Sequence, residues 1–404
     1  MVPGAGKTES AIAFMNAHQD RKFIFVTPYL EEDARIVRCC PALYFKEPES
    51  YGYSTKSDDI VELIRRGENI ASTHALFERY NRETVELIRE RGYTLIMDEV
   101  MNVVKEEKME PETLKILFES KTISLAEDGL HVVWSADHDG GKDYKDLKRK
   151  ADMGNLLLFQ NAFLFWTFPV EFFDVFEEVY ILTYMFKAQV QSYYYQMHGV
   201  GVEFIYTRRT PDGRYEFSPD YEAPEYARQL ASHVHVCKDS KLNSIGSDKF
   251  SLSKSWFNKS GNTKEQPKLK KLRNNMNTYF RTRMGVKCCD VIWTVFKDYR
   301  DLMDHNGFKS SFVSCTTRAT NEWRDRHYLA YCINVFFRTS VKNYFTRVGG
   351  LKVDEDAYAL SEMVQWIWRS AIRCGEDVYV YVPSHRMRTL LEGWLQRLAD
   401  GQPY

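Results

Sequence analysis

The first eight residues, Met-Val-Pro-Gly-Ala-Gly-Lys-Thr, combine small side chains with a lysine and a threonine. The small residues leave room for backbone N–H groups to point at a polyphosphate. Lys7 would then reach the β and γ phosphates, and the Thr8 hydroxyl would be a ligand of Mg²⁺. The residues expected to bind the nucleotide are Gly4, Ala5, Gly6, Lys7 and Thr8. This spacing predicts that the chain binds a nucleoside triphosphate with Mg²⁺.

The complete form of this loop, G-x-x-x-x-G-K-[ST], has its first glycine at the position that Met1 occupies here. The strand that usually leads into the loop would need residues ahead of Met1. We therefore expect a nucleotide loop without its first strand. A truncated nucleotide-binding protein with weak or no turnover stays open as an alternative.

A second pattern is the apolar run Thr94–Met97, which ends in the carboxylates Asp98 and Glu99. In a nucleoside triphosphatase, the first acid at such a strand end holds Mg²⁺ through its water shell. The second acid orients or deprotonates the water that attacks the γ-phosphate. Because the run follows the glycine-rich loop by about ninety residues, the two patterns together predict triphosphate hydrolysis.

Between these patterns lies Ile70-Ala-Ser-Thr-His, a strand that ends in hydroxyl and imidazole groups. Ser72, Thr73 and His74 could hold a phosphodiester backbone without contacting the bases. The alternative is structural, with His74 capping the helix that follows.

Near the end of the chain, Gln365, Arg369 and Arg373 recur every four residues in a helical pattern that begins near Asp356. This spacing places them on one stripe of a helix. Two guanidinium groups presented together suit a γ-phosphate, whose developing charge an arginine stabilises during hydrolysis. A salt-bridged surface helix is the alternative.

Taken in order, these four patterns resemble motifs I, Ib, II and VI of superfamily 2 helicases, and in particular the viral DExH branch. The resemblance implies two RecA-like lobes with parallel sheets and ATP in the cleft between them. It implies an ATP-dependent helicase or translocase with ATP and Mg²⁺ as cofactors and single-stranded or partly duplex nucleic acid as partner. It also implies catalytic roles for Lys7, Asp98, Glu99, Gln365, Arg369 and Arg373.

Further positions follow from the order of the family's motifs. Thr183, at the end of the apolar run Val179–Leu182, resembles motif III, for which Ser135–Asp137 is a rival. The run Val291–Phe296 resembles motif IV. Motif V falls either on Thr317 and Arg318 or near Asn334. The nucleic-acid residues implied are Ser72, Thr73, His74, Thr183, Thr317 and Arg318.

Short apolar runs alternate with longer helical patterns, which predicts an α/β fold with mostly parallel sheets. We expect a first lobe over 1–222 with an insertion at about 125–176, and a second lobe over 287–404. Between them, residues 223–286 read as a basic, irregular linker. Its lysines and arginines could contact a phosphate backbone, or the segment could be a solvated linker.

The composition limits the remaining classes. Hydrophobic residues are 44% of the 404 residues and charged residues 27%, and no apolar run is long enough for a membrane span. The eight cysteines include no C-x-x-C pair, which argues against a zinc ribbon or a disulfide framework. We expect a cytoplasmic protein without membrane contact, for which a phage or prophage origin is one option. A packaging-motor ATPase remains the alternative enzyme.

Overall fold

The computed structural model describes residues 3–52, 54–137, 140–222, 225–260, 265–304, 307–315 and 322–402. The chain divides into two compact units. Unit 1 comprises Met1–Lys7, Phe204–Phe337 and Asp354–Tyr404, and unit 2 comprises Thr8–Glu203 and Arg338–Val353. No helix among the described residues is long and apolar enough to cross a membrane.

Unit 2 is built on a four-stranded parallel sheet with the order β2-β1-β3-β9. Its strands are β1 (Lys22–Thr27), β2 (Ile70–Thr73), β3 (Tyr93–Asp98) and β9 (Glu178–Leu182). The two central strands are apolar on both faces because helices cover them, as in other parallel sheets. Unit 2 also contains the helices α1 (Lys7–Ala17), α2 (Leu30–Cys39), α3 (Lys56–Arg66), α4 (His74–Phe77), α5 (Arg82–Arg91), α8 (Val190–Met197) and α14 (Thr339–Arg347).

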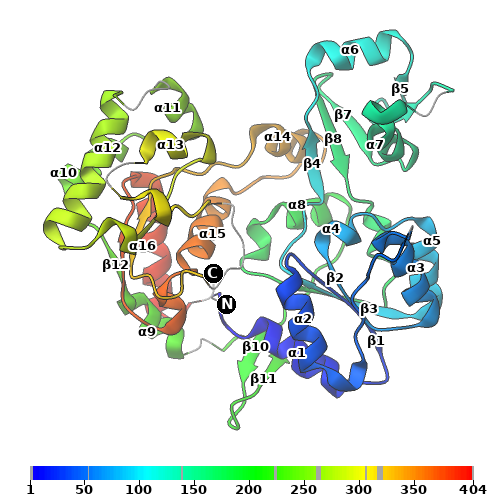
Figure 1. Ribbon diagram of the computed structural model, residues 1–404, viewed down its shortest axis with the longest axis horizontal. Coiled ribbons are helices and arrows are strands. Elements are labelled where there is room, and N and C mark those ends of the chain that lie inside the picture. Colours follow the sequence, from blue (N-terminus) through cyan, green and yellow to red (C-terminus); the bar gives the residue numbers. More distant parts are fainter. Residues whose placement is uncertain are drawn as a thin grey trace. The chain divides into compact units, whose positions relative to one another are not determined.

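A subdomain of unit 2 lies outside this sheet (Figure 1). It contains the antiparallel sheet β4-β8-β7 and the hairpin β5-β6, with a hydrophobic core of its own. Its elements are β4 (Val104–Glu107), α6 (Pro111–Glu119), β5 (Ile123–Leu125), β6 (Val132–Trp134), α7 (Gly141–Asp152), β7 (Leu156–Phe159) and β8 (Phe163–Thr167). These elements begin at Val104, earlier than the expected insertion at about 125–176.

Unit 1 contains a second four-stranded parallel sheet with the order β12-β15-β14-β13. Its strands are β12 (Val234–Val236), β13 (Val291–Thr294), β14 (Tyr328–Tyr331) and β15 (Val378–Tyr381). The hairpin β10 (Tyr206–Arg209) and β11 (Tyr215–Ser218) precedes it. Helices α9 (Glu225–His233) and α16 (His385–Ala399) pack together against β12, and α15 (Glu355–Ile367) packs on α16. The predicted α/β class with two parallel sheets is therefore confirmed.

The prediction of an irregular linker over 223–286 is wrong. Besides α9 and β12, this stretch forms α10 (Ser240–Asn243), α11 (Lys254–Lys259) and α12 (Pro267–Asn277). Leu269, Leu272 and Met276 lie on one face of α12 and are completely buried, and Pro267 occupies its first turn, where proline is favourable. Burying each of these side chains contributes about 1.5–3 kcal/mol. The burial of three apolar residues at helical spacing thus stabilises a helix in this stretch despite its polar composition.

Candidate functional site

The carboxylates Asp98 and Glu99 lie at the carboxyl end of β3, one of the two central strands of unit 2. Leu95, Ile96 and Met97 are completely buried, which fixes the strand and therefore the position of the residues that end it. The Glu99 N–H donates to the Leu182 carbonyl of β9 over 3.1 Å. Ligands of parallel α/β sheets bind at this edge.

The two predicted Mg²⁺ ligands meet at this edge. Thr8 is in the first turn of α1, and its Oγ1 donates to Oδ1 of Asp98 over 3.5 Å. Neighbouring oxygen ligands of Mg²⁺ are about 3 Å apart, because each metal–oxygen bond is about 2.1 Å long. A hydroxyl and a carboxylate at this separation fit an ion that keeps several waters and also binds phosphate oxygens.

Glu99 has an unusual backbone conformation. Its φ is 64°, in the left-handed region that residues other than glycine rarely adopt. Strain of this kind costs about 1–3 kcal/mol and collects at functional sites. The Thr183 Oγ1 donates to Glu99 Oε2 over 3.0 Å, so the carboxylate is held from the neighbouring strand end. The structure thus brings together Thr8, Asp98, Glu99 and Thr183 in unit 2.

The structure also distinguishes Thr183 from Ser135–Asp137, the other candidate for motif III. Thr183 directly follows β9, which pairs with β3. Ser135–Asp137 follow β6, in the subdomain outside the main sheet.

The glycine-rich loop is held within unit 1 by residues that the sequence patterns did not reveal. The Thr207 Oγ1 of β10 donates to the Ala5 carbonyl over 2.6 Å. A Cβ on Gly6 would lie 2.3 Å from the Tyr215 ring, and one on Gly4 would lie 2.9 Å from Trp368 Nε1. Both glycines also have a positive φ, of 77° for Gly4 and 81° for Gly6. Both positions therefore require glycine for two reasons, the backbone conformation and the close contact with an aromatic side chain.

The nucleic-acid residues predicted on β2 differ in exposure. Ser72 is buried, whereas Thr73 and His74 are half-buried at the strand end. Thr73, and not His74, caps α4, because its Oγ1 accepts a hydrogen bond from the Leu76 N–H over 3.4 Å. The His74 imidazole therefore does not serve as the cap of that helix.

The prediction that Gln365, Arg369 and Arg373 share one helical stripe is wrong. Helix α15 ends at Ile367, so only Gln365 belongs to it, and Arg373 lies in the short 3₁₀ helix η9 (Ala371–Cys374). Trp368 is the C-cap of α15, and the extended backbone of Ser370 separates α15 from η9. Arg369 is 6% exposed and donates to the Ser314 carbonyl over 3.4 Å, whereas Arg373 is exposed. One arginine is therefore buried and the other exposed, and they do not share a helix.

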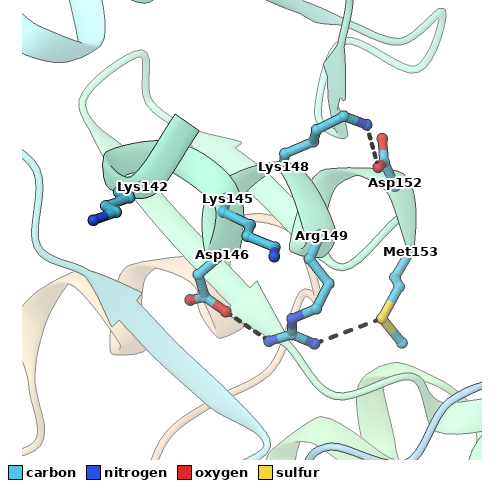
Figure 2. Close-up of a pocket in the computed structure, with 7 residues that line it drawn as sticks. All are labelled: Lys142, Lys145, Asp146, Lys148, Arg149, Asp152 and Met153. Atoms are coloured by element: carbon cyan, nitrogen blue, oxygen red, sulfur yellow. Dashed lines mark hydrogen bonds and ion pairs between the residues drawn. The ribbon is translucent and has the colours of Figure 1, made fainter. Parts of the chain in front are cut away.

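Thr317 and Arg318 lie outside the described residues. Among the described residues, no group of three or more His, Cys, Asp or Glu side chains could hold a metal ion. A separate surface pocket in the subdomain is lined by charged residues of α7, including Lys142, Lys145 and Arg149 (Figure 2). None of the residues singled out in the sequence lines it.

Comparison with known proteins gives two family matches. A model described as the YonV C-terminal Rossmann-like domain matches residues 228–395, and one described as the YonV middle domain matches residues 104–166. The second match coincides with the subdomain that begins at β4. The SPbeta prophage-derived uncharacterized protein YonV of Bacillus subtilis (strain 168) is 36% identical over 406 residues, covering 98% of this chain and 97% of the relative.

Two solved structures are also similar over most of the chain. One, described as XPD_APO, has a TM-score of 0.44 and 12% identity, and the match covers 98% of this chain and 94% of that one. The other, described as XPD_Helicase, has a TM-score of 0.43 and 10% identity, with coverage of 99% and 94%.

Proposed function

The chain belongs to the YonV family, and from the geometry of its site we propose that it is an ATP-hydrolysing nucleic-acid translocase of the helicase type. The observation that carries this proposal is the group of four side chains at the carboxyl edge of the unit 2 sheet. Thr8 contacts Asp98, and Thr183 contacts the strained Glu99. These are a hydroxyl and a carboxylate for Mg²⁺, next to a second, separately held carboxylate.

Each residue has a distinct part in the proposed hydrolysis. The backbone N–H groups of the glycine-rich loop and Lys7 bind the phosphates, and Thr8 and Asp98 hold Mg²⁺. When bound, Mg²⁺ neutralises charge on the phosphate oxygens. Glu99 orients the attacking water and accepts its proton. Because Thr183 fixes one oxygen of Glu99, the other oxygen is available to that water.

The nucleic-acid partner is proposed from the same sheet edge. The ends of β1 and β2 are in register, with Thr27 opposite Thr73. The half-exposed Thr73 hydroxyl can donate a hydrogen bond to a phosphate oxygen, which positions a strand without base selectivity. Nε2 of His74 is buried, so a contact of His74 with nucleic acid stays a prediction. In this scheme Thr183 touches the general base and lies on the strand next to β3, so it is the residue through which strand binding would influence hydrolysis. The roles of Arg369 and Arg373 in hydrolysis stay predictions.

The test is ATP hydrolysis with and without single-stranded DNA or RNA, in the wild type and in Lys7→Ala. We expect nucleic acid to stimulate turnover of the wild type and Lys7→Ala to lose both nucleotide binding and turnover. Lys142→Ala, which removes an exposed lysine of α7, is the matched control and should behave as the wild type. Equal hydrolysis in all three proteins would overturn the proposal, and nucleotide binding without any turnover would favour a degenerate nucleotide-binding protein.

A further inference from the structure

The positive charge of the chain is concentrated in unit 1. Residues 238–287 contain thirteen Lys and Arg but only three Asp and Glu, a net charge of +10 in a chain whose net charge is −1. Ten of the thirteen are lysines. The rest of the chain, taken together, therefore carries a net negative charge. The positive charge of residues 238–287 is thus a local feature and does not follow from the overall composition.

The fold brings several of these cations close to one another. Helix α12 buries its leucines and leaves Lys268, Lys270 and Lys271 exposed. Lys271 Nζ donates to the Ser244 Oγ just after α10 over 3.2 Å, and the Lys268 ammonium lies 5.7 Å from the Trp256 ring of α11. Figure 1 shows α10, α11 and α12 together on one side of unit 1. We call the exposed side of these three helices the α10–α12 surface.

Few carboxylates neutralise this surface. Asp239 caps α10 and pairs with Arg283, and Glu265 lies 3.8 Å from Lys270. Within residues 238–287, several exposed cations form no ion pair with any carboxylate that the structure describes: Lys238, Lys241, Lys249, Lys259, Lys268, Arg281 and Lys287. Of these, Lys241, Lys259 and Lys268 belong to the α10–α12 surface itself, and unpaired cations give it a positive local potential.

Helix α7 shows what a neutralised basic helix looks like in the same chain. Its pocket contains Lys148 paired with Asp152 and Arg149 paired with Asp146 (Figure 2). Lys150 reaches both Glu107 and Asp146. Only Lys142 and Lys145 are exposed without an ion pair to a described carboxylate. The two basic regions therefore differ in the share of their cations that are paired with carboxylates, and not only in the number of cations.

We propose that the α10–α12 surface binds the phosphodiester backbone of nucleic acid without contacting the bases. This inference rests on the proposed function and adds to it a contact surface on unit 1. Lysines act as point charges toward phosphates, and neutralising phosphates releases the counterions condensed on the nucleic acid. An acidic protein fits less well, because the cores of protein–protein interfaces are depleted in lysine and built on aromatic and arginine side chains.

The test compares two triple charge reversals with the same change in net charge. The variant K241E/K268E/K271E alters the α10–α12 surface, and K142E/K145E/R149E alters α7. The affinity for a single-stranded oligonucleotide and for a duplex is measured between about 50 and 200 mM salt. We expect the first variant to bind at least tenfold more weakly at low salt. For the single strand, the slope of log affinity against log salt should shrink by about 2, since each lost phosphate contact removes about 0.7.

The control variant should keep the slope of the wild type. An unchanged slope in K241E/K268E/K271E, or an equal loss in both variants, would overturn the inference, as would polyglutamate binding as tight as nucleic-acid binding. Nucleotide binding and basal ATP hydrolysis, measured without nucleic acid on the same proteins, separate the two proposals. If the wild type hydrolyses ATP and binds oligonucleotides, and K241E/K268E/K271E binds them equally well, only the surface is refuted. If the wild type binds oligonucleotides through this surface but does not hydrolyse ATP, only the ATPase is refuted.

Discussion

The two four-stranded parallel sheets of this chain share an architecture but differ at their carboxyl edges. In unit 2, the half-exposed Thr73, Asp98 and Thr183 stand at or directly after strand ends. In unit 1, the corresponding positions include Thr294 and Cys332, which are completely buried. An open edge with oxygen-bearing side chains can do chemistry, whereas a closed edge only supports packing. The same fold therefore carries the proposed catalytic side chains in unit 2, whereas unit 1 holds the glycine-rich loop through its hairpin and carries the positive surface.

The largest expected effect comes from removing the metal-ligand hydroxyl at the open edge. Thr8→Ala should lower the rate constant of ATP hydrolysis by about 100-fold or more, the usual cost of losing one preorganised electrostatic contact. Thr8→Ser keeps the hydroxyl and should retain most activity. Thr294→Val alters a threonine at the closed edge and should leave the rate unchanged, because that hydroxyl is buried without a hydrogen bond to any residue that the structure describes. Equal rates of hydrolysis in Thr8→Ala and Thr294→Val would contradict the claim that only the unit 2 edge takes part in ATP hydrolysis.

A smaller effect should follow from removing the hydrogen bond that holds the glycine-rich loop in unit 1. Thr207 is 7% exposed, and Thr207→Val would leave the Ala5 carbonyl without its donor, at a cost of about 1–3 kcal/mol. We expect nucleotide affinity to fall by about tenfold, with Thr207→Ser close to the wild type. Titration with a fluorescent ATP analogue measures this, and oligonucleotide affinity measured without nucleotide should not change. If nucleotide affinity also stays the same, the hairpin does not position the loop.

The smallest effect on activity concerns a buried acid of α2, whose substitution should change the pH dependence of stability. Asp33 lies in the first turn of α2 and is 1% exposed, and burial, reinforced by Glu47, raises its pKa to about 7. Because the unfolded chain loses this proton near pH 4, folding becomes less favourable as the pH rises from about 4 to about 7. Asp33→Asn removes this dependence. The difference in unfolding free energy between variant and wild type should change by about 1.4 kcal/mol per pH unit within that window. Parallel stability curves would show that Asp33 is not held in its protonated form.

Much of the open edge was predictable because its patterns are local. The strand ending in Asp98 and Glu99 and the strand before Thr183 are short apolar runs, and parallel pairing then brings their ends to one edge. The loop at Gly4–Thr8 also has a fixed spacing. What these patterns could not give is the left-handed φ of Glu99, which follows from its place between β3 and Leu182.

The failures have equally specific causes. Spacing of four residues indicated one helix through Arg373, but α15 ends at Ile367 and the extended Ser370 separates it from the turn that contains Arg373. The polar composition of 223–286 masked the buried face of α12. The contacts of Thr207 and Tyr215 with the loop join residues about 200 positions apart, and no local pattern encodes such a pairing.

The measurement that tests the central claim most directly is single-turnover ATP hydrolysis by Glu99→Gln, with nucleotide affinity determined on the same protein. Glutamine keeps the size of the side chain and can still bond Thr183, but it cannot accept the proton of the attacking water. The account predicts nucleotide affinity like that of the wild type and hydrolysis slower by about 100-fold or more. Glu112→Gln, at an exposed position of α6, should hydrolyse ATP normally. Hydrolysis by Glu99→Gln at the wild-type rate would contradict the assignment of Glu99, and with it the proposed site.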